Sequence, residues 1–183
     1  MPPKADTRLH EKILKAAERL WAKQGEKGLT LRAIARAAGT TTPTVYKRFR
    51  NKRALQVALA ERFKAEMNEH CFAAPRLEDV YRRYVQYAEE NQHKYELLWR
   101  TWTEVFHPQG PRPMRTWFLT QLAQRFGGKP EDYAEGFYAL FLLAHGAASL
   151  LTISGDPETH AELRKHFPSI GDTVFRNIAL FRE

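Results

Sequence analysis

Residues 28–39 read Gly-Leu-Thr-Leu-Arg-Ala-Ile-Ala-Arg-Ala-Ala-Gly, and residues 40–49 continue with Thr-Thr-Thr-Pro-Thr-Val-Tyr-Lys-Arg-Phe. Thr30 can cap a short helix over about 31–38, which ends at Gly39 because glycine tolerates a left-handed backbone. The threonines before Pro43 can cap a second short helix, with the proline in its first turn. Two short helices joined by a glycine turn predict a helix-turn-helix.

The rest of the chain also has helical periodicity, and no window alternates apolar and polar residues over the length of a strand. A first helix is expected over about 8–23, ending near Gly25, and Asn51 can cap a linker helix that runs to the break at Pro75. Later helices are expected over about 78–91, 93–106, 113–126, 131–153 and 170–182. The sequence therefore predicts an all-α fold.

Positive charge is concentrated in the first third of the chain. Residues 1–55 hold 14 Lys and Arg against 4 Asp and Glu, whereas residues 56–183 hold 15 against 17. A polyanion such as DNA, or an anionic membrane surface, would exploit this asymmetry, although a solubilising surface would have the same charge. Charge alone leaves these alternatives open.

Four segments, 17–25, 28–39, 42–49 and 51–55, resemble the N-terminal region of the TetR repressor family. The matching residues are Thr30, Ile34, Ala35, Gly39, Tyr46, Phe49 and Lys52. The resemblance implies a three-helix DNA-binding domain over 1–55, joined by the linker helix to a ligand-binding and dimerisation domain over 56–183. Two positions depart from the family pattern: Thr40 is usually apolar, and a histidine is common at Arg48.

The resemblance also implies roles for individual residues at the DNA. The residues expected to face the major groove are Thr42, Pro43, Thr44 and Lys47, and Arg32 would reach a base or a phosphate. Those expected to hold phosphates are Thr30, Thr41, Tyr46 and Lys52, the last aided by the positive end of its helix. Tyr46 could instead be a core aromatic residue whose hydroxyl reaches the surface.

Aromatic residues cluster in the second half, where Tyr95, Trp99, Trp102 and Phe106 share one helical face. Such a stripe is compatible with an ordinary core or with an apolar ligand pocket. The resemblance to the TetR family makes the ligand pocket more plausible than the stripe alone does. Ala144-His145-Gly146 is similar to the Trp-His-Gly motif of one group of TetR C-terminal domains, with alanine in place of tryptophan. His145 could also be a hydrogen-bonded core residue. The expected ligand-binding residues are Trp99, Trp102, Phe106, Trp117, Phe141 and His145.

Residues 137–153 are apolar nearly all round, so this helix must be covered on several sides. It is short for a membrane span of about 20 residues. We expect its own domain to cover one side and a second copy of the chain the other, in a homodimer through 131–153 and 170–182 with Ala147 and Ile178 at the contact. No membrane partner is expected.

The sequence carries no recognisable catalytic or metal-binding motif. It lacks H-E-x-x-H, G-x-S-x-G and a phosphate-binding glycine loop, and Cys71 is its only cysteine. We therefore expect no enzyme activity, no cofactor and no metal.

Met1–Leu9 has no apolar run, which predicts neither a secretory signal nor an anchor and favours the cytoplasm. The leading hypothesis is a homodimeric repressor that binds operator DNA and a small-molecule effector. A helical interaction module for proteins or membranes is the alternative, and a small-molecule-binding enzyme is less favoured.

Overall fold

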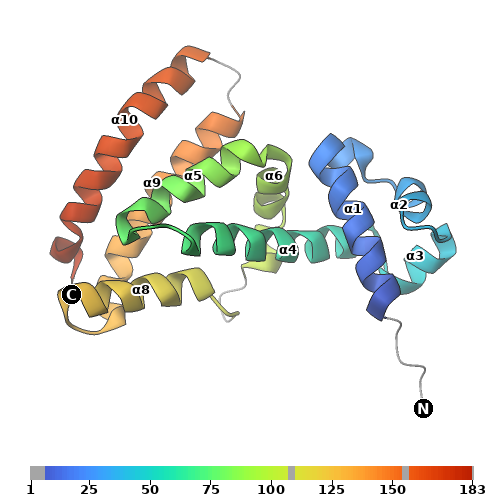
Figure 1. Ribbon diagram of the computed structural model, residues 1–183, viewed down its shortest axis with the longest axis horizontal. Helices are drawn as coiled ribbons and strands as arrows, with labels where there is room; N and C mark the ends of the chain where they lie inside the picture. Colours follow the sequence, from blue (N-terminus) through green and yellow to red (C-terminus); the bar gives the residue numbers. More distant parts are fainter. Residues whose placement is uncertain (1–6, 107–109, 154–156, 183) are drawn as a thin grey trace. The chain divides into compact units, whose positions relative to one another are not determined.

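The computed structural model describes residues 7–106, 110–153 and 157–182 (Figure 1). The described residues form α-helices and three 3-10 helices without any strand, which confirms the all-α prediction. The chain divides into two compact units, one of Met1–Ala65 with His93–His107 and one of Glu66–Gln92 with Pro108–Glu183. The assignment of separate functions to 1–55 and 56–183 stays a prediction.

Six of the helices in the described residues contribute to the first unit. They are α1 (Thr7–Gly28), α2 (Leu31–Ala37), α3 (Thr42–Arg48), most of α4 (Lys52–Phe72), nearly all of α6 (Gln92–Arg100) and α7 (Trp102–Val105). Helix α1 is interrupted where its end was expected: Gly25, with φ 57°, has a non-helical backbone, and one further turn follows the kink as far as Gly28. The single helix expected over 93–106 is interrupted at Thr101, whose buried hydroxyl donates to the Leu97 carbonyl at 2.8 Å.

Helices α6 and α7 are fixed to the N-terminal helices at several points. The buried indole N–H of Trp21 on α1 donates to the His93 carbonyl at 2.6 Å. Lys64 on α4 donates to the Val105 carbonyl at 2.8 Å, and Arg53 at the start of α4 pairs with Glu104. Residues 93–106 thus pack as part of the unit that contains the helix-turn-helix.

The second unit contains η1 (Leu77–Asp79), α5 (Val80–Glu90), α8 (Pro113–Phe126), η2 (Pro130–Tyr133), α9 (Ala134–Ile153), α10 (Pro157–Arg176) and η3 (Ile178–Phe181). Helix α9 packs against α5 on one side and against α10 on another (Figure 1). The expected helix over 170–182 was wrong in extent, because α10 begins at Pro157 and ends at Arg176. Pro168 lies inside this helix without ending it.

Helix α9 is only partly covered within its own unit. Ala147 on α9 and Ile178 on η3 are buried inside the chain, so their expected place at an intersubunit contact was wrong. Leu142 and Leu150 are instead 63% and 49% exposed. Pro130–Thr152 is long and apolar enough to cross a membrane by length and composition, a test that the core helix of a soluble protein also meets, and 33% of its apolar window is buried.

Candidate DNA-binding and ligand sites

Helices α2 and α3 begin at the threonine caps that the sequence predicted. The Thr30 hydroxyl accepts from the Ala33 N–H at 3.2 Å, and the Thr41 hydroxyl accepts from the Thr44 N–H at 3.4 Å, which confirms both as N-caps. Gly39, with φ 59°, makes the turn between the helices. The core residues that anchor the pair are Ile34, Ala35, Val45 and Phe49.

The side chains expected at DNA are exposed or half-buried, in contrast to these core residues. Tyr46 is 53% exposed, so the alternative of a core aromatic residue was wrong. The other exposed members of the set are Thr30, Arg32, Thr41, Pro43 and Lys47, and the half-buried ones are Thr42 and Thr44. Helix α3 therefore presents an aromatic hydroxyl, a cation and hydroxyl groups to solvent together, which are groups that DNA-reading helices use.

Lys52, exposed at the first residue of α4, has an acidic neighbour that the sequence did not reveal. Its Nζ lies 3.5 Å from Glu26 Oε1, and Arg100 on α6 donates to Glu26 Oε2 at 2.6 Å. The Arg100 hydrogen bond and the two nearby cations hold the pKa of Glu26 below its ordinary value. Glu26 is thus ionised at neutral pH and lies within reach of a lysine expected to hold a DNA phosphate. These three residues are far apart in sequence, so no local signal could have joined them.

Three of the six expected ligand-binding residues lie together in the first unit. The ring centroids of Trp99 and Trp102 are 4.4 Å apart, and those of Trp102 and Phe106 are 4.0 Å apart, with the rings nearly parallel. Tyr95 contacts Trp99 edge-on. Rings at these distances are in contact, so no ligand fits between them in this arrangement. All three stacked rings are half-buried, which leaves part of the stack open to contact.

The other three expected ligand-binding residues lie in the second unit. His145 stacks on Phe141 at 6.0 Å, Phe141 contacts Tyr84 on α5 edge-on, and Trp117 contacts Phe72 edge-on. Burial lowers the pKa of His145, so its imidazole is neutral at pH 7. No local sequence signal points to Tyr84 and Phe72, because their helices come into contact with the predicted residues only in the folded unit.

Comparison with known proteins gives a family match at the N-terminal end. Residues 13–59 match the family model for bacterial regulatory proteins of the tetR family. The class A tetracycline repressor protein from transposon 1721 of Escherichia coli is 41% identical over 73 residues, which are 40% of this chain and 33% of that protein. The sequence match thus spans about a third of the curated relative.

Solved structures extend the likeness to the whole fold. A TetR transcriptional regulator from Streptomyces coelicolor has a TM-score of 0.67 at 20% identity, covering 94% of this chain and 98% of its own. A TetR variant from Acinetobacter baumannii AYE, crystallised with minocycline, has a TM-score of 0.65 at 18% identity, covering 98% and 99%. At these identities the structures show the fold alone. Residues 13–59 therefore match the tetR family of bacterial regulatory proteins, and the chain as a whole shares the all-helical fold of the TetR structures.

Proposed function

We propose that the protein is a cytoplasmic repressor that binds a palindromic operator as a homodimer and is released from it by a small, largely apolar ligand. The observation that carries this proposal is the outward surface of α3, where Tyr46 and Lys47 are exposed beside the capped first turn. The net excess of ten positive charges in residues 1–55 supports the same partner, since phosphate neutralisation supplies most non-specific affinity.

In this proposal α3 enters the major groove. Its first turn carries Thr42, Pro43 and Thr44, and Lys47 follows one turn later, so these residues would read base edges. The other expected residues would contact the DNA backbone or neighbouring bases and fix the position of the protein along the duplex. They are Thr30, Arg32, Thr41, Tyr46 and Lys52. One short helix reads few bases, so a two-fold dimer that presents two such helices about 34–36 Å apart explains how a sufficiently long site is recognised.

The exposed side of α9 supports a dimer. Tyr138, Leu142 and Leu150 are all exposed, and a Cβ added at Gly146 would meet open space. These positions follow one another at intervals of four residues and therefore lie along one face of the helix, in the order Tyr138, Leu142, Gly146 and Leu150. A second copy of this helix would cover the face in a four-helix arrangement with α10. We favour this partner over a membrane because other residues of α9 are buried in its own unit.

Two groups of aromatic residues are candidates for the effector site. The half-buried rings of Trp99, Trp102 and Phe106, and the group of Trp117, Phe141 and neutral His145, supply apolar contact surface. A ligand would release operator only if it binds the DNA-free state more tightly, by about 1–3 kcal/mol for a typical coupling. Operator would then weaken ligand binding by the same factor.

Selection of bound duplexes from a random library tests the proposal directly. We expect sites with inverted symmetry and binding that weakens steeply with salt. Lys47→Ala should relax the base preference at its contact, whereas Lys165→Ala, an equal charge change at an exposed position of α10, should leave the selected sites unchanged. Selected sites without symmetry would contradict the dimeric repressor, and failure to retard any duplex at low salt would favour a helical interaction module.

A further inference from the structure

The second unit contains an open cavity of about 400 Å³ whose lining includes none of the residues expected to bind a ligand. It lies between the start of α5, the end of α8 and the last turns of α10. Its lining residues are Arg76, Glu78, Arg82, Arg125, Phe126, Asp172, Phe175 and Arg176. The volume is in the range of small-molecule sites, and four guanidinium groups in a half of the chain with no excess positive charge are unexpected on composition.

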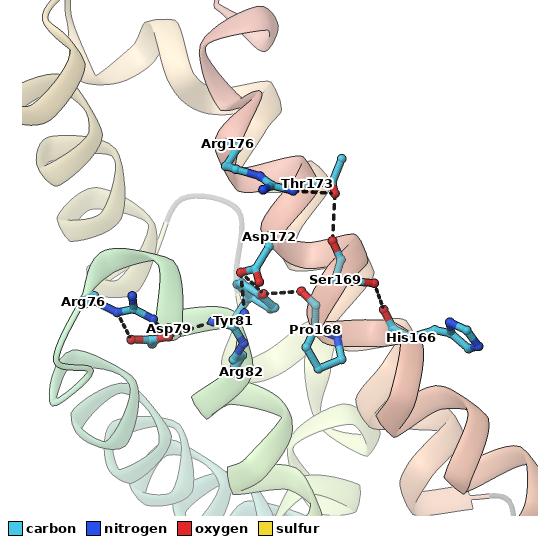
Figure 2. Close-up of polar contacts among 10 residues, drawn as sticks. All are labelled: Arg76, Asp79, Tyr81, Arg82, His166, Pro168, Ser169, Asp172, Thr173 and Arg176. Atoms are coloured by element: carbon cyan, nitrogen blue, oxygen red, sulfur yellow. Dashed lines mark hydrogen bonds and ion pairs between the residues drawn. The ribbon is translucent and has the colours of Figure 1, made fainter.

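Two of the guanidinium groups are held in place by carboxylates (Figure 2). Arg76 makes a two-pronged contact with Asp79, with donor–acceptor distances of 2.8 and 2.9 Å. Arg82 donates to Asp79 at 2.8 Å and also to Asp172, and its guanidinium lies 4.9 Å from the centre of the Tyr81 ring. These contacts fix one wall of the cavity before any ligand arrives, which lowers the entropic cost of binding.

The third guanidinium group, that of Arg125, lies against the aromatic residues of the cavity. Arg125 pairs with Glu78 at 2.8 Å and lies over the rings of Phe126 and Phe175, at 5.3 and 5.5 Å from their centres. Phe175 is buried and Phe126 is partly exposed, so the two rings offer a fixed surface and an accessible edge. An apolar group of a ligand could lie against this surface beside the cation.

Arg176 completes the set and differs from the other three. Within the described part of the chain it is seen to donate only to the Thr173 hydroxyl, at 3.3 Å, and it forms no ion pair there (Figure 2). The three carboxylates Glu78, Asp79 and Asp172 are all engaged by the other arginines, and Asp79 pairs with both Arg76 and Arg82. Four cations against three anions leave one positive charge, and Arg176 has further N–H groups with which to bind an anion.

We propose that this cavity is a second small-molecule site, which takes a carboxylate with an apolar, ring-sized body. The carboxylate binds the guanidinium of Arg176, and the ring lies against Phe126 and Phe175. The site is additional to the effector and operator sites of the proposed function and depends on neither.

The cavity and the exposed apolar residue Ile170 lie on different sides of α10. Each residue of an α-helix is turned by about 100° from the one before it, so side chains two residues apart point to nearly opposite sides of the helix. Asp172 therefore projects to the side of α10 opposite to Ile170, which is 48% exposed and suited to a contact with another chain. Arg176, four residues after Asp172, lies on the cavity side.

Calorimetric titration of the full chain with 2-naphthoate and with neutral 2-naphthamide tests the site. We expect saturable binding of 2-naphthoate at one site per chain and binding of the amide at least tenfold weaker, since only the acid forms the charge-assisted hydrogen bonds. Arg176→Gln should weaken 2-naphthoate binding by tenfold or more. Arg164→Gln, the same change on the same helix at a residue paired with Glu89, should bind as the wild type does.

Each contrary result overturns a defined part of the proposal. Equal binding of the acid and the amide, or unchanged binding by Arg176→Gln with a native circular dichroism spectrum, places the ligand elsewhere. Inorganic phosphate that displaces 2-naphthoate with equal affinity overturns the assignment of an apolar body. The absence of saturable 2-naphthoate binding at millimolar concentration overturns the site.

Discussion

Gly171 on α10 lies directly against the ring of Tyr81 on α5, so closely that a Cβ at Gly171 would overlap the ring. The Tyr81 hydroxyl is 2.9 Å from both the Pro168 carbonyl and Asp172 Oδ1, and its single proton can be donated to one of them at a time (Figure 2). Burial, followed by the hydrogen bond to Asp172, raises the pKa of Tyr81, so the phenol stays protonated. The approach of the two helices therefore depends on a residue without a side chain.

Gly171→Ala should destabilise the protein by about 1–3 kcal/mol, because the added methyl group must displace the Tyr81 ring or separate the helices. Ser169→Ala, an exposed change two residues earlier on α10, should alter stability by no more than about 0.5 kcal/mol. Urea denaturation followed by circular dichroism measures both. Equal midpoints for the two variants would show that the contact is readily relaxed.

Ionised Asp79 stabilises the fold, and we expect this contribution to be lost in acid. Its hydrogen bond with Arg76, and the further contact with Arg82, lower its pKa below the ordinary value of about 4. A carboxyl whose pKa is lower in the folded state stabilises the fold above about pH 4, and this contribution is lost as the pH falls through the folded-state pKa. The stability difference between wild type and Asp79→Asn should therefore shrink between about pH 5 and pH 2. Urea midpoints across this range measure it, and a difference independent of pH would be contrary to the assignment.

The helix-turn-helix could be predicted closely because its signals are local. Thr30 and Thr41 cap α2 and α3 through their hydroxyl groups, and Gly39 makes the turn between them, so α2 begins at the expected residue and ends within about one residue of the expected position. The start of α10 was missed because Pro157 resembles a helix break, although a proline is tolerated in the first turn of a helix.

The remaining features depend on contacts between distant segments. The stripe of Trp99, Trp102 and Phe106 predicts a shared face, but the sequence could not say that these rings stack on one another. The arginine-lined cavity was also hidden, because Arg76, Arg125 and Arg176 are about fifty residues apart and each resembles a solvated surface charge. Periodicity gives the face of a helix and leaves its partner open.

Glu26 should restrain DNA binding through Lys52. Glu26→Gln removes the carboxylate 3.5 Å from the Lys52 ammonium group and frees it for a phosphate. An exposed ion pair is worth about 0.2–1 kcal/mol, so generic duplex binding at low salt should tighten by a factor of about 1.4 to 5. Glu11→Gln loses the same charge, but its carboxylate pairs with Arg62, so it should have a smaller effect. Fluorescence anisotropy with a labelled duplex measures both, and equal effects would reduce the role of Glu26 to net charge.

Leu142 offers the sharpest test of the proposed dimer. Because 63% of this residue is exposed in the isolated chain, Leu142→Glu should leave the helical fold intact while placing a charge in the interface. The wild type should sediment as a dimer at micromolar concentration and the variant as a monomer with much weaker operator binding. Gln124→Glu, which introduces the same charge at an exposed position of α8, should remain dimeric. A monomeric wild type would remove the dimer from the proposal, and a dimeric Leu142→Glu would move the interface away from this face of α9.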